Sequence, residues 1–265
     1  MTPRIPSATA PADVIPSHTF SNASLLEPPE TGGPNGGYLA KLLWEASVDR
    51  VELRELAPRV ATVQFISSPA YEPMRIDVEV PRKSLNSCFL SVTAYQAGHV
   101  RLAGQLFLGR SEPGPCHQPD EIPAAPAPEL CPPAYLPRGR LPHFRQHCDY
   151  RIVRAPAVFS GAGRAEMLCW IRMRDLPLDA GGMLFLLDAM FPPFFLAATL
   201  PHPTVTTHLQ VEYSDSFLEE KPGAWVLVSL RVRQWAGGWC IEDADAWSAG
   251  GWLLAVARQM RRVFA

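Results

Sequence analysis

The sequence predicts an α+β protein in which one chain carries two helix-wrapped antiparallel sheets, either continuous or back to back. Three observations lead to this prediction. A proline-rich stretch divides the 265 residues into two halves, each half has a Gly-Gly pair ahead of an apolar helical pattern, and each half continues into several alternating strands. Because these features follow the same order in both halves, the chain is interpreted as an internal repeat.

The boundaries follow from composition. Residues 1–17 are rich in Pro, Ala, Ser and Thr and hold few large apolar side chains, so we predict a disordered tail. Ten of the 28 prolines fall between Ser111 and Pro142. Proline is excluded from helix interiors and central strands, so residues 111–147 are assigned as a linker. The two folded units are then 18–110 and 148–265.

Each half is expected to begin with a helix that opens at paired glycines. These helices lie in "PNGGYLAKLLWEA", from Pro34, and in "DAGGMLFLLDAMFPP", from Asp179. The strands expected after them have alternating or apolar patterns: "RVATVQFIS", "RIDVEVPR", "FLSVTAYQ" and "VRLAGQLFLGR" in the first half, and "VTTHLQVEYS", "WVLVSLRVRQW", "WCIEDADAWS" and "WLLAVARQMRR" in the second. Gly37 precedes Gln64 by 27 positions and Gly182 precedes Gln210 by 28, which supports the repeat.

The composition limits the partners. With 24 basic and 26 acidic residues, the chain has no strong field to attract nucleic acid or an anionic membrane. Its longest apolar run is broken by Asp188 and two prolines, so we expect no membrane span. The six cysteines show no C-x-x-C spacing and no leader segment is evident, which predicts a cytoplasmic protein with free thiols. No motif indicates a metal site or a cofactor.

The opening "PNGGYLAKLL", the proline-rich linker and the second-half runs "LLDAMFPP", "PTVTTHLQV" and "GGWLLAVARQM" resemble the acyl-CoA thioesterase II type, a double-hotdog family of the thioesterase-like superfamily. The resemblance covers about 20–110 and 148–262. In that family an Asp on the second helix, a Thr that opens the next strand and a Gln on the last strand are catalytic. The resemblance therefore implies catalytic roles for Asp188, Thr204 and Gln259.

Thioester hydrolysis needs a positioned water, a base and donors for the oxyanion. Asp188 would act as the base, with Thr204 and Gln259 orienting the water. Asp188 lies about 9 Å along its helix from Gly182, too far to use that helix start, so the oxyanion donor is expected from the first half. The residues expected to contact the substrate there are Asn35, Gly36, Gly37 and Tyr38. Alternatively, the paired glycines only allow the two helix ends to pack closely.

The repeat predicts one site per chain. Aligning the halves places Trp44 opposite Asp188, Pro58 opposite Thr204 and Phe107 opposite Gln259, so the first half lacks all three functional side chains. The direction in which Thr204 points stays open, because strand alternation groups it with Thr206 and away from the expected core positions.

The expected activity is hydrolysis of an acyl thioester, carried on CoA or on a carrier protein, to a carboxylic acid and a thiol. A non-hydrolytic enzyme on the same scaffold, which transfers, cyclises or dehydrates an acyl group, is an alternative. A non-catalytic acyl-binding protein is another. A homo-oligomer is possible, and no cofactor is expected.

Overall fold

The computed structural model describes residues 13–20, 33–49, 55–134, 144, 147–174, 176–219 and 223–265. The first half contains β1 (Asp13–Phe20), α1 (Gly36–Val48), β2 (Ala57–Phe65), β3 (Met74–Lys83), β4 (Ser87–Gln96) and β5 (His99–Gly109). The second contains β6 (Cys148–Arg154), β7 (Glu166–Met173), α2 (Ala180–Asp188), α3 (Phe194–Ala197), β8 (Thr204–Tyr213), β9 (Val226–Ala236), β10 (Trp239–Ser248) and β11 (Leu253–Val263). Short 3-10 helices cover Pro128–Leu130 and Asp215–Glu219.

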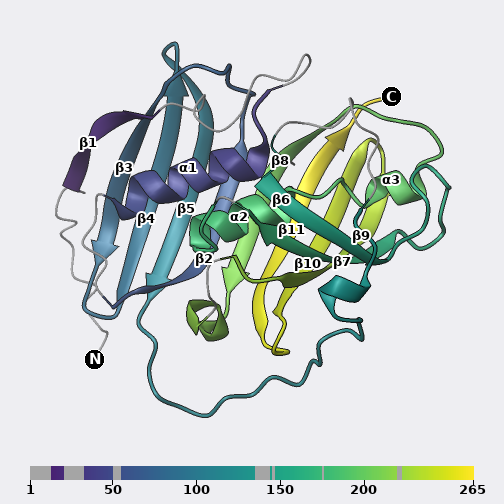
Figure 1. The fold of residues 1–265 in the computed structure, drawn as a ribbon. Helices are drawn as coiled ribbons and strands as arrows, with labels where there is room; N and C mark the ends of the chain where they lie inside the picture. The colour runs from purple at the N-terminus through teal and green to yellow at the C-terminus, as the bar shows by residue number, and fades with distance from the viewer. Residues whose placement is uncertain are drawn as a thin grey trace, which may run out of the picture.

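The strands of both halves form one antiparallel sheet. Within the described residues it has 11 strands, in the order β1-β3-β4-β5-β2-β8-β11-β10-β9-β7-β6 (Figure 1). The halves meet where β2 pairs with β8, with Ala61 opposite Val211 and Val63 opposite Leu209. Of the two expected arrangements, the sheets are therefore continuous, because backbone hydrogen bonds between β2 and β8 join the halves edge to edge.

Alternating side chains explain why the predicted strands form. In β3, Met74, Ile76 and Val78 are buried, whereas Arg75 and Glu79 are exposed. One face of each such strand removes apolar surface from water and the other keeps its polar groups hydrated. All of the strands that the alternation predicts are present.

Three further strands were not predicted. β6 and β7 extend the second half to one edge of the sheet, and β1 forms the opposite edge against β3. β1 includes residues 13–17, which the composition had assigned to the disordered tail. These residues form a strand although they hold few apolar side chains, because β1 is held by backbone hydrogen bonds to the edge strand β3. The register shifts between Ile15 and His18, around Pro16, which is the kind of irregularity where a strand tolerates proline.

The two main helices lie side by side across the same face of the sheet (Figure 1). Their direction is antiparallel, because Gly37 near the start of α1 lies against Leu184 and Asp188 near the end of α2. At the other end Gly181 lies against Trp44. A Cβ on Gly37 would lie 2.8 Å from the Leu184 carbonyl oxygen, so this glycine permits the close approach of the helices.

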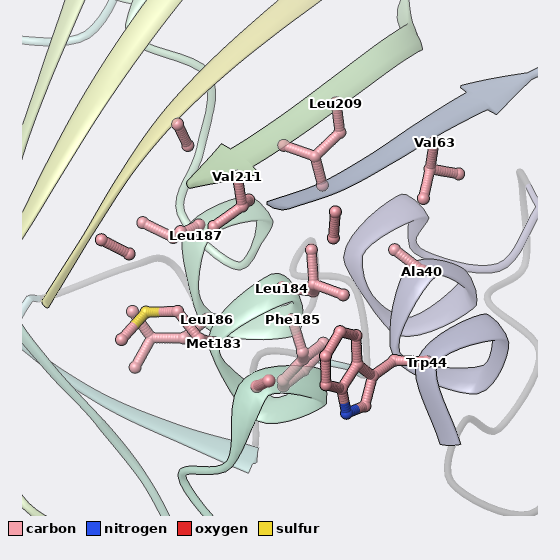
Figure 2. Close-up of a cluster of buried hydrophobic side chains, with 14 of the residues drawn as sticks. Ala40, Trp44, Val63, Met183, Leu184, Phe185, Leu186, Leu187, Leu209 and Val211 are labelled. Carbon is pink, nitrogen blue, oxygen red and sulfur yellow. The ribbon is translucent and has the colours of Figure 1, made fainter. Parts of the chain in front are cut away.

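The core fills the space between these helices and the central strands. Figure 2 shows Leu184 and Ala40 from the helices close to Val63 of β2 and to Leu209 and Val211 of β8. All five side chains are fully buried or nearly so. The seam between the halves is therefore part of one continuous hydrophobic core, which fixes the position of α1 relative to α2.

The linker packs against the second half. The Trp170 indole donates a hydrogen bond to the Pro126 carbonyl at 2.9 Å, and the Leu253 amide donates to the Gln118 side chain at 2.9 Å. Cys131 joins a small apolar cluster with Trp170 and Trp247. Among the described residues, no helix is long and apolar enough to cross a membrane.

Candidate active site

The candidate site is built around Asp188, the last residue of α2. The helix ends there, and Pro192 and Pro193 follow, neither of which could continue it. The carboxylate is 6% exposed and lies at the C-terminal end of its own helix, where the helix dipole opposes a negative charge. A buried carboxylate in this position needs strong partners from elsewhere in the fold.

The start of α1 supplies two of these partners. The Gly37 amide donates to Asp188 Oδ2 at 2.9 Å, and Asn35 Nδ2 donates to the same oxygen at 3.1 Å. Asn35 is also the N-cap of α1, since its Oδ1 accepts from the Tyr38 amide at 2.9 Å. The positive end of the α1 dipole therefore faces Asp188 and offsets the unfavourable end of α2.

This geometry places the paired glycines against Asp188. The Gly37 amide donates to Asp188, and its expected role as the oxyanion donor stays a prediction. Both glycines allow the contact, because a Cβ on Gly36 would lie 3.1 Å from Asp188 Oδ2 and one on Gly37 would lie 2.8 Å from Asp188 Cβ. Tyr38 is 1% exposed and packs into the main core.

The other carboxylate oxygen is held by β11. Gln259 Nε2 donates to Asp188 Oδ1 at 2.9 Å, and Arg261 Nη2 donates to the same atom at 3.0 Å. Arg261 Nη2 also donates to Gln259 Oε1, which fixes the direction of the Gln259 amide. Residues two apart on a strand share a face, so β11 presents both side chains to Asp188.

Arg261 connects the carboxylate to two further side chains. Its Nε donates to Glu242 Oε2 at 2.5 Å, and its Nη1 donates to Thr206 Oγ1 at 2.8 Å. Glu242 Oε1 in turn accepts from the Phe194 amide at 3.1 Å. Burial lowers the pKa of Arg261, but the charges of Glu242 and Asp188 outweigh this and raise it above its usual range. The guanidinium stays positively charged between two carboxylates.

The Cys240 thiol is not a candidate nucleophile. Cys240 Sγ lies 4.0 Å from Glu242 Oε1 and is fully buried. Burial, with a further contribution from the Glu242 charge, raises the pKa of Cys240 to about 12. The thiol therefore stays protonated near neutral pH, and only the thiolate is a good nucleophile.

The structure does not bring Thr204 to Asp188. Thr204 Oγ1 donates to the Arg262 carbonyl at 3.0 Å, whereas Thr206 contacts Arg261. A register shift between β8 and β11 leaves Thr207 as an extra residue, so that Thr206 faces Arg261 and Leu209 faces Gln259. Because of this extra residue, Thr206 lies on the same face of the sheet as Leu209, whereas strict alternation had placed the two on opposite faces.

Three polar residues of the site were missed from the sequence: Arg261, Glu242 and Thr206. A signal for Arg261 was present, because it follows Gln259 by two positions on one strand and so shares its face. Glu242 could be found only from strand pairing, since it lies opposite Gln259 in the β10–β11 ladder.

The corresponding position in the first half holds an indole in place of the carboxylate. Trp44, which aligns with Asp188, lies against Gly181 near the start of α2 and 6.1 Å from the Tyr213 ring. Asp179 caps α2 by accepting from the Gly182 amide at 2.7 Å. Among the described residues, no group of three or more His, Cys, Asp or Glu side chains is arranged to hold a metal ion.

Comparison with protein families gives two matches that together cover nearly the whole chain. Residues 26–115 match the acyl-CoA thioesterase N-terminal domain, and residues 119–263 match the acyl-CoA thioesterase C-terminal domain. Comparison with curated proteins gives no match.

Several solved structures have the same fold. A conserved protein of unknown function with a hot dog fold from Alicyclobacillus acidocaldarius is 24% identical, with 88% of each chain covered and a TM-score of 0.80. The acyl-CoA thioesterase II TesB2 from Mycobacterium marinum is 21% identical, with 86% of this chain and 88% of that chain covered and a TM-score of 0.69. A 12:0-ACP thioesterase from Umbellularia californica is 11% identical, with 94% of each chain covered and a TM-score of 0.53.

These structural likenesses show a hotdog fold. The two family matches, which cover both halves and the residues around Asp188, show that this chain belongs to the acyl-CoA thioesterase family.

Proposed function

We propose that the protein hydrolyses an acyl thioester, with Asp188 as the general base that activates a water molecule. The observation that carries this proposal is a buried carboxylate, held between the start of α1 and β11 in a chain of the acyl-CoA thioesterase family. A buried charge of this kind is costly and needs either a partner or a function.

Gln259 and Thr206 are proposed to orient the water. Gln259 Nε2 uses one of its two N–H groups on Asp188, so the other can donate to a water beside the carboxylate. Thr206 Oγ1 accepts from Arg261, which leaves its own hydroxyl hydrogen to donate. Thr204, which the family resemblance suggested, remains the alternative for this role.

Asn35 is proposed to contact the substrate. Among the described residues, four groups donate to the Asp188 carboxylate, two to each oxygen. One of these donors must therefore leave before Asp188 accepts a proton. The bond from Asn35, at 3.1 Å, is the longest of the four. A thioester carbonyl that takes this N–H would free Oδ2 and gain a donor for its developing negative charge.

The leaving thiol is proposed to be that of CoA, in line with the family. A carrier-protein thioester is the second candidate, because the 12:0-ACP thioesterase from Umbellularia californica shares the fold. A non-hydrolytic role, either acyl transfer or acyl binding, is favoured by one observation, namely the complete occupation of the Asp188 carboxylate by donors.

Thiol release from acyl-CoAs of several chain lengths, and from acylated carrier protein, tests the proposal. We expect turnover by the wild type and a kcat lower by about 10²–10⁴-fold for Asp188→Asn, the range for loss of a general base. Glu45→Gln is the matched control, because Glu45 is a carboxylate on the other helix that pairs with Lys41. It should retain wild-type kcat.

The acyl acceptor is identified by the same assay in ¹⁸O-labelled water. Hydrolysis places one labelled oxygen in the product acid. Thiol release that requires an added acceptor and gives no label would establish transfer, and acyl binding without thiol release would establish a binding protein. Wild-type turnover by a folded Asp188→Asn variant would remove Asp188 from the mechanism.

A further inference from the structure

We propose that Arg261, anchored by Glu242, is a positioning residue that orients the groups around Asp188 and sets the charge that Asp188 experiences. The kinetic part of this inference rests on the proposed function. The electrostatic part concerns the protein without substrate and can be tested separately.

The guanidinium of Arg261 contacts the polar side chains that β8, β10 and β11 contribute to the site, and Asp188 as well. It donates to Asp188 Oδ1, to Gln259 Oε1, to Thr206 Oγ1 and to Glu242 Oε2. Through these bonds it determines which end of the Gln259 amide faces Asp188 and where the Thr206 oxygen lies. A lysine ammonium is compact and could not span the same set, whereas the planar fork of arginine can.

Glu242 holds this fork in place. It lies on β10 diagonally across from Arg261, and its second carboxylate oxygen accepts from the Phe194 amide at 3.1 Å. Both oxygens of Glu242 thus have partners, and the side chain is 4% exposed. Arg261 is therefore fixed from the side opposite to Asp188, and its position does not depend on Asp188 alone.

The three charges are unbalanced. Asp188 and Glu242 carry two negative charges and Arg261 carries one positive charge, and all three residues are less than 9% exposed. The other described groups that contact Asp188 are neutral: Asn35 and the Gly37 amide of α1, and Gln259 of β11. Removing the Glu242 charge should leave more of the positive charge of Arg261 acting on Asp188 and favour its ionised form.

The same two strands provide a matched control on the opposite face of the sheet. Asp243 follows Glu242 on β10 and pairs with Arg258, whose Nε lies 2.7 Å from Asp243 Oδ1. Asp243→Asn and Glu242→Gln each remove one negative charge from β10 at neighbouring positions. Only Glu242→Gln removes it from the side that faces Asp188.

The experiment follows the ionisation of Asp188 by ¹³C NMR of its carboxyl carbon, assigned by its absence in Asp188→Asn, together with the pH profile of kcat. In Glu242→Gln we expect the Asp188 titration and the acid limb of kcat to move to lower pH, with KM near the wild-type value. Asp243→Asn should leave both unchanged. Arg261→Met should move the Asp188 titration to higher pH, because an opposite charge is lost.

Arg261→Lys tests the orienting role, since it retains the charge and loses the fork. We expect the Asp188 titration to stay close to the wild type and kcat to fall by roughly 10–10²-fold, as for a misplacement of about 1 Å. Thermal unfolding of each variant confirms that it folds. If Arg261→Met does not fold, Glu242→Gln and Arg261→Lys still decide the question.

The inference is overturned if folded Glu242→Gln titrates like Asp243→Asn, or if Arg261→Lys turns over at the wild-type rate. A wild type that releases no thiol would instead refute the proposed function. The NMR titrations would then still decide whether Arg261 and Glu242 control the charge on Asp188.

Discussion

Gly37→Ala tests whether the close approach of the two helices is what places Asp188. The added Cβ would lie 2.8 Å from Asp188 Cβ, 2.8 Å from the Leu184 carbonyl oxygen and 3.0 Å from Phe185 Cα. Ordinary carbon contacts need about 3.5 Å or more. Two of these three atoms belong to the α2 backbone, so the helices must separate, because no flexible side chain can move aside in their place.

The size of the effect follows from two opposing contributions. Overpacking of this kind costs about 1–3 kcal/mol of unfolding free energy, whereas alanine gains up to about 1 kcal/mol over glycine in helix propensity. A net loss of about 1–2 kcal/mol would lower Tm by roughly 2–8 °C for a chain of this size. The separation also weakens the bond from the Gly37 amide to Asp188, so we expect kcat to fall by about 10–10²-fold.

Gly181→Ala is the matched control for this prediction. Gly181 is the corresponding glycine at the start of α2, and its added Cβ would meet Lys41 Cγ and Trp44 Cδ1, both at 3.2 Å. These are side-chain atoms far along α1 from Asp188, so the variant should lose less stability and retain kcat. The reasoning would be refuted if Gly37→Ala had the Tm and thiol-release rate of the wild type, or if both variants lost activity equally.

Three more predictions can be checked with the same assays. Thr206→Val should lower kcat by at least tenfold while Thr204→Val leaves it unchanged, because only Thr206 is joined to the site; the reverse result would restore the sequence-based assignment. Asn35→Asp should retain the helix cap but lower kcat at neutral pH, because it replaces a donor to Asp188 with a second carboxylate; the cap is checked by an unchanged helical circular dichroism signal. Burial raises the pKa of Asp149, but hydrogen bonds from two arginines outweigh it and hold that pKa below its usual value. The stability that Asp149 contributes is present above its unfolded-state pKa and is lost as pH falls through the folded-state pKa, so Asp149→Asn should flatten the acid side of a Tm-against-pH curve.

The sequence by itself determined the elements and their order. Period-2 alternation located the strands from β2 to β5 and from β8 to β11, because burying one face of a strand leaves a pattern in the letters. The Gly-Gly pairs located both helix starts, and the repeat singled out Asp188 as a carboxylate where the other half has Trp44. In the structure Gln259, Asn35 and Gly37 each donate a hydrogen bond to Asp188. Their roles in the chemistry stay predictions.

The tertiary structure decided what depends on pairing between distant segments. The pairing of β2 with β8 decided that the two sheets are continuous and not back to back, because no local pattern records which edges will meet. The bulge at Thr207 places both Thr204 and Thr206 on the face that carries Leu209, because one extra residue reverses the alternation of β8. Of the two, Thr206 is the one that contacts Arg261. Arg261 and Glu242 look like ordinary solvated strand residues in the sequence. In the folded protein both are buried, because α2 ends over this part of the sheet. Arg261 there pairs with Asp188 at the end of α2 and with Glu242 on the neighbouring strand.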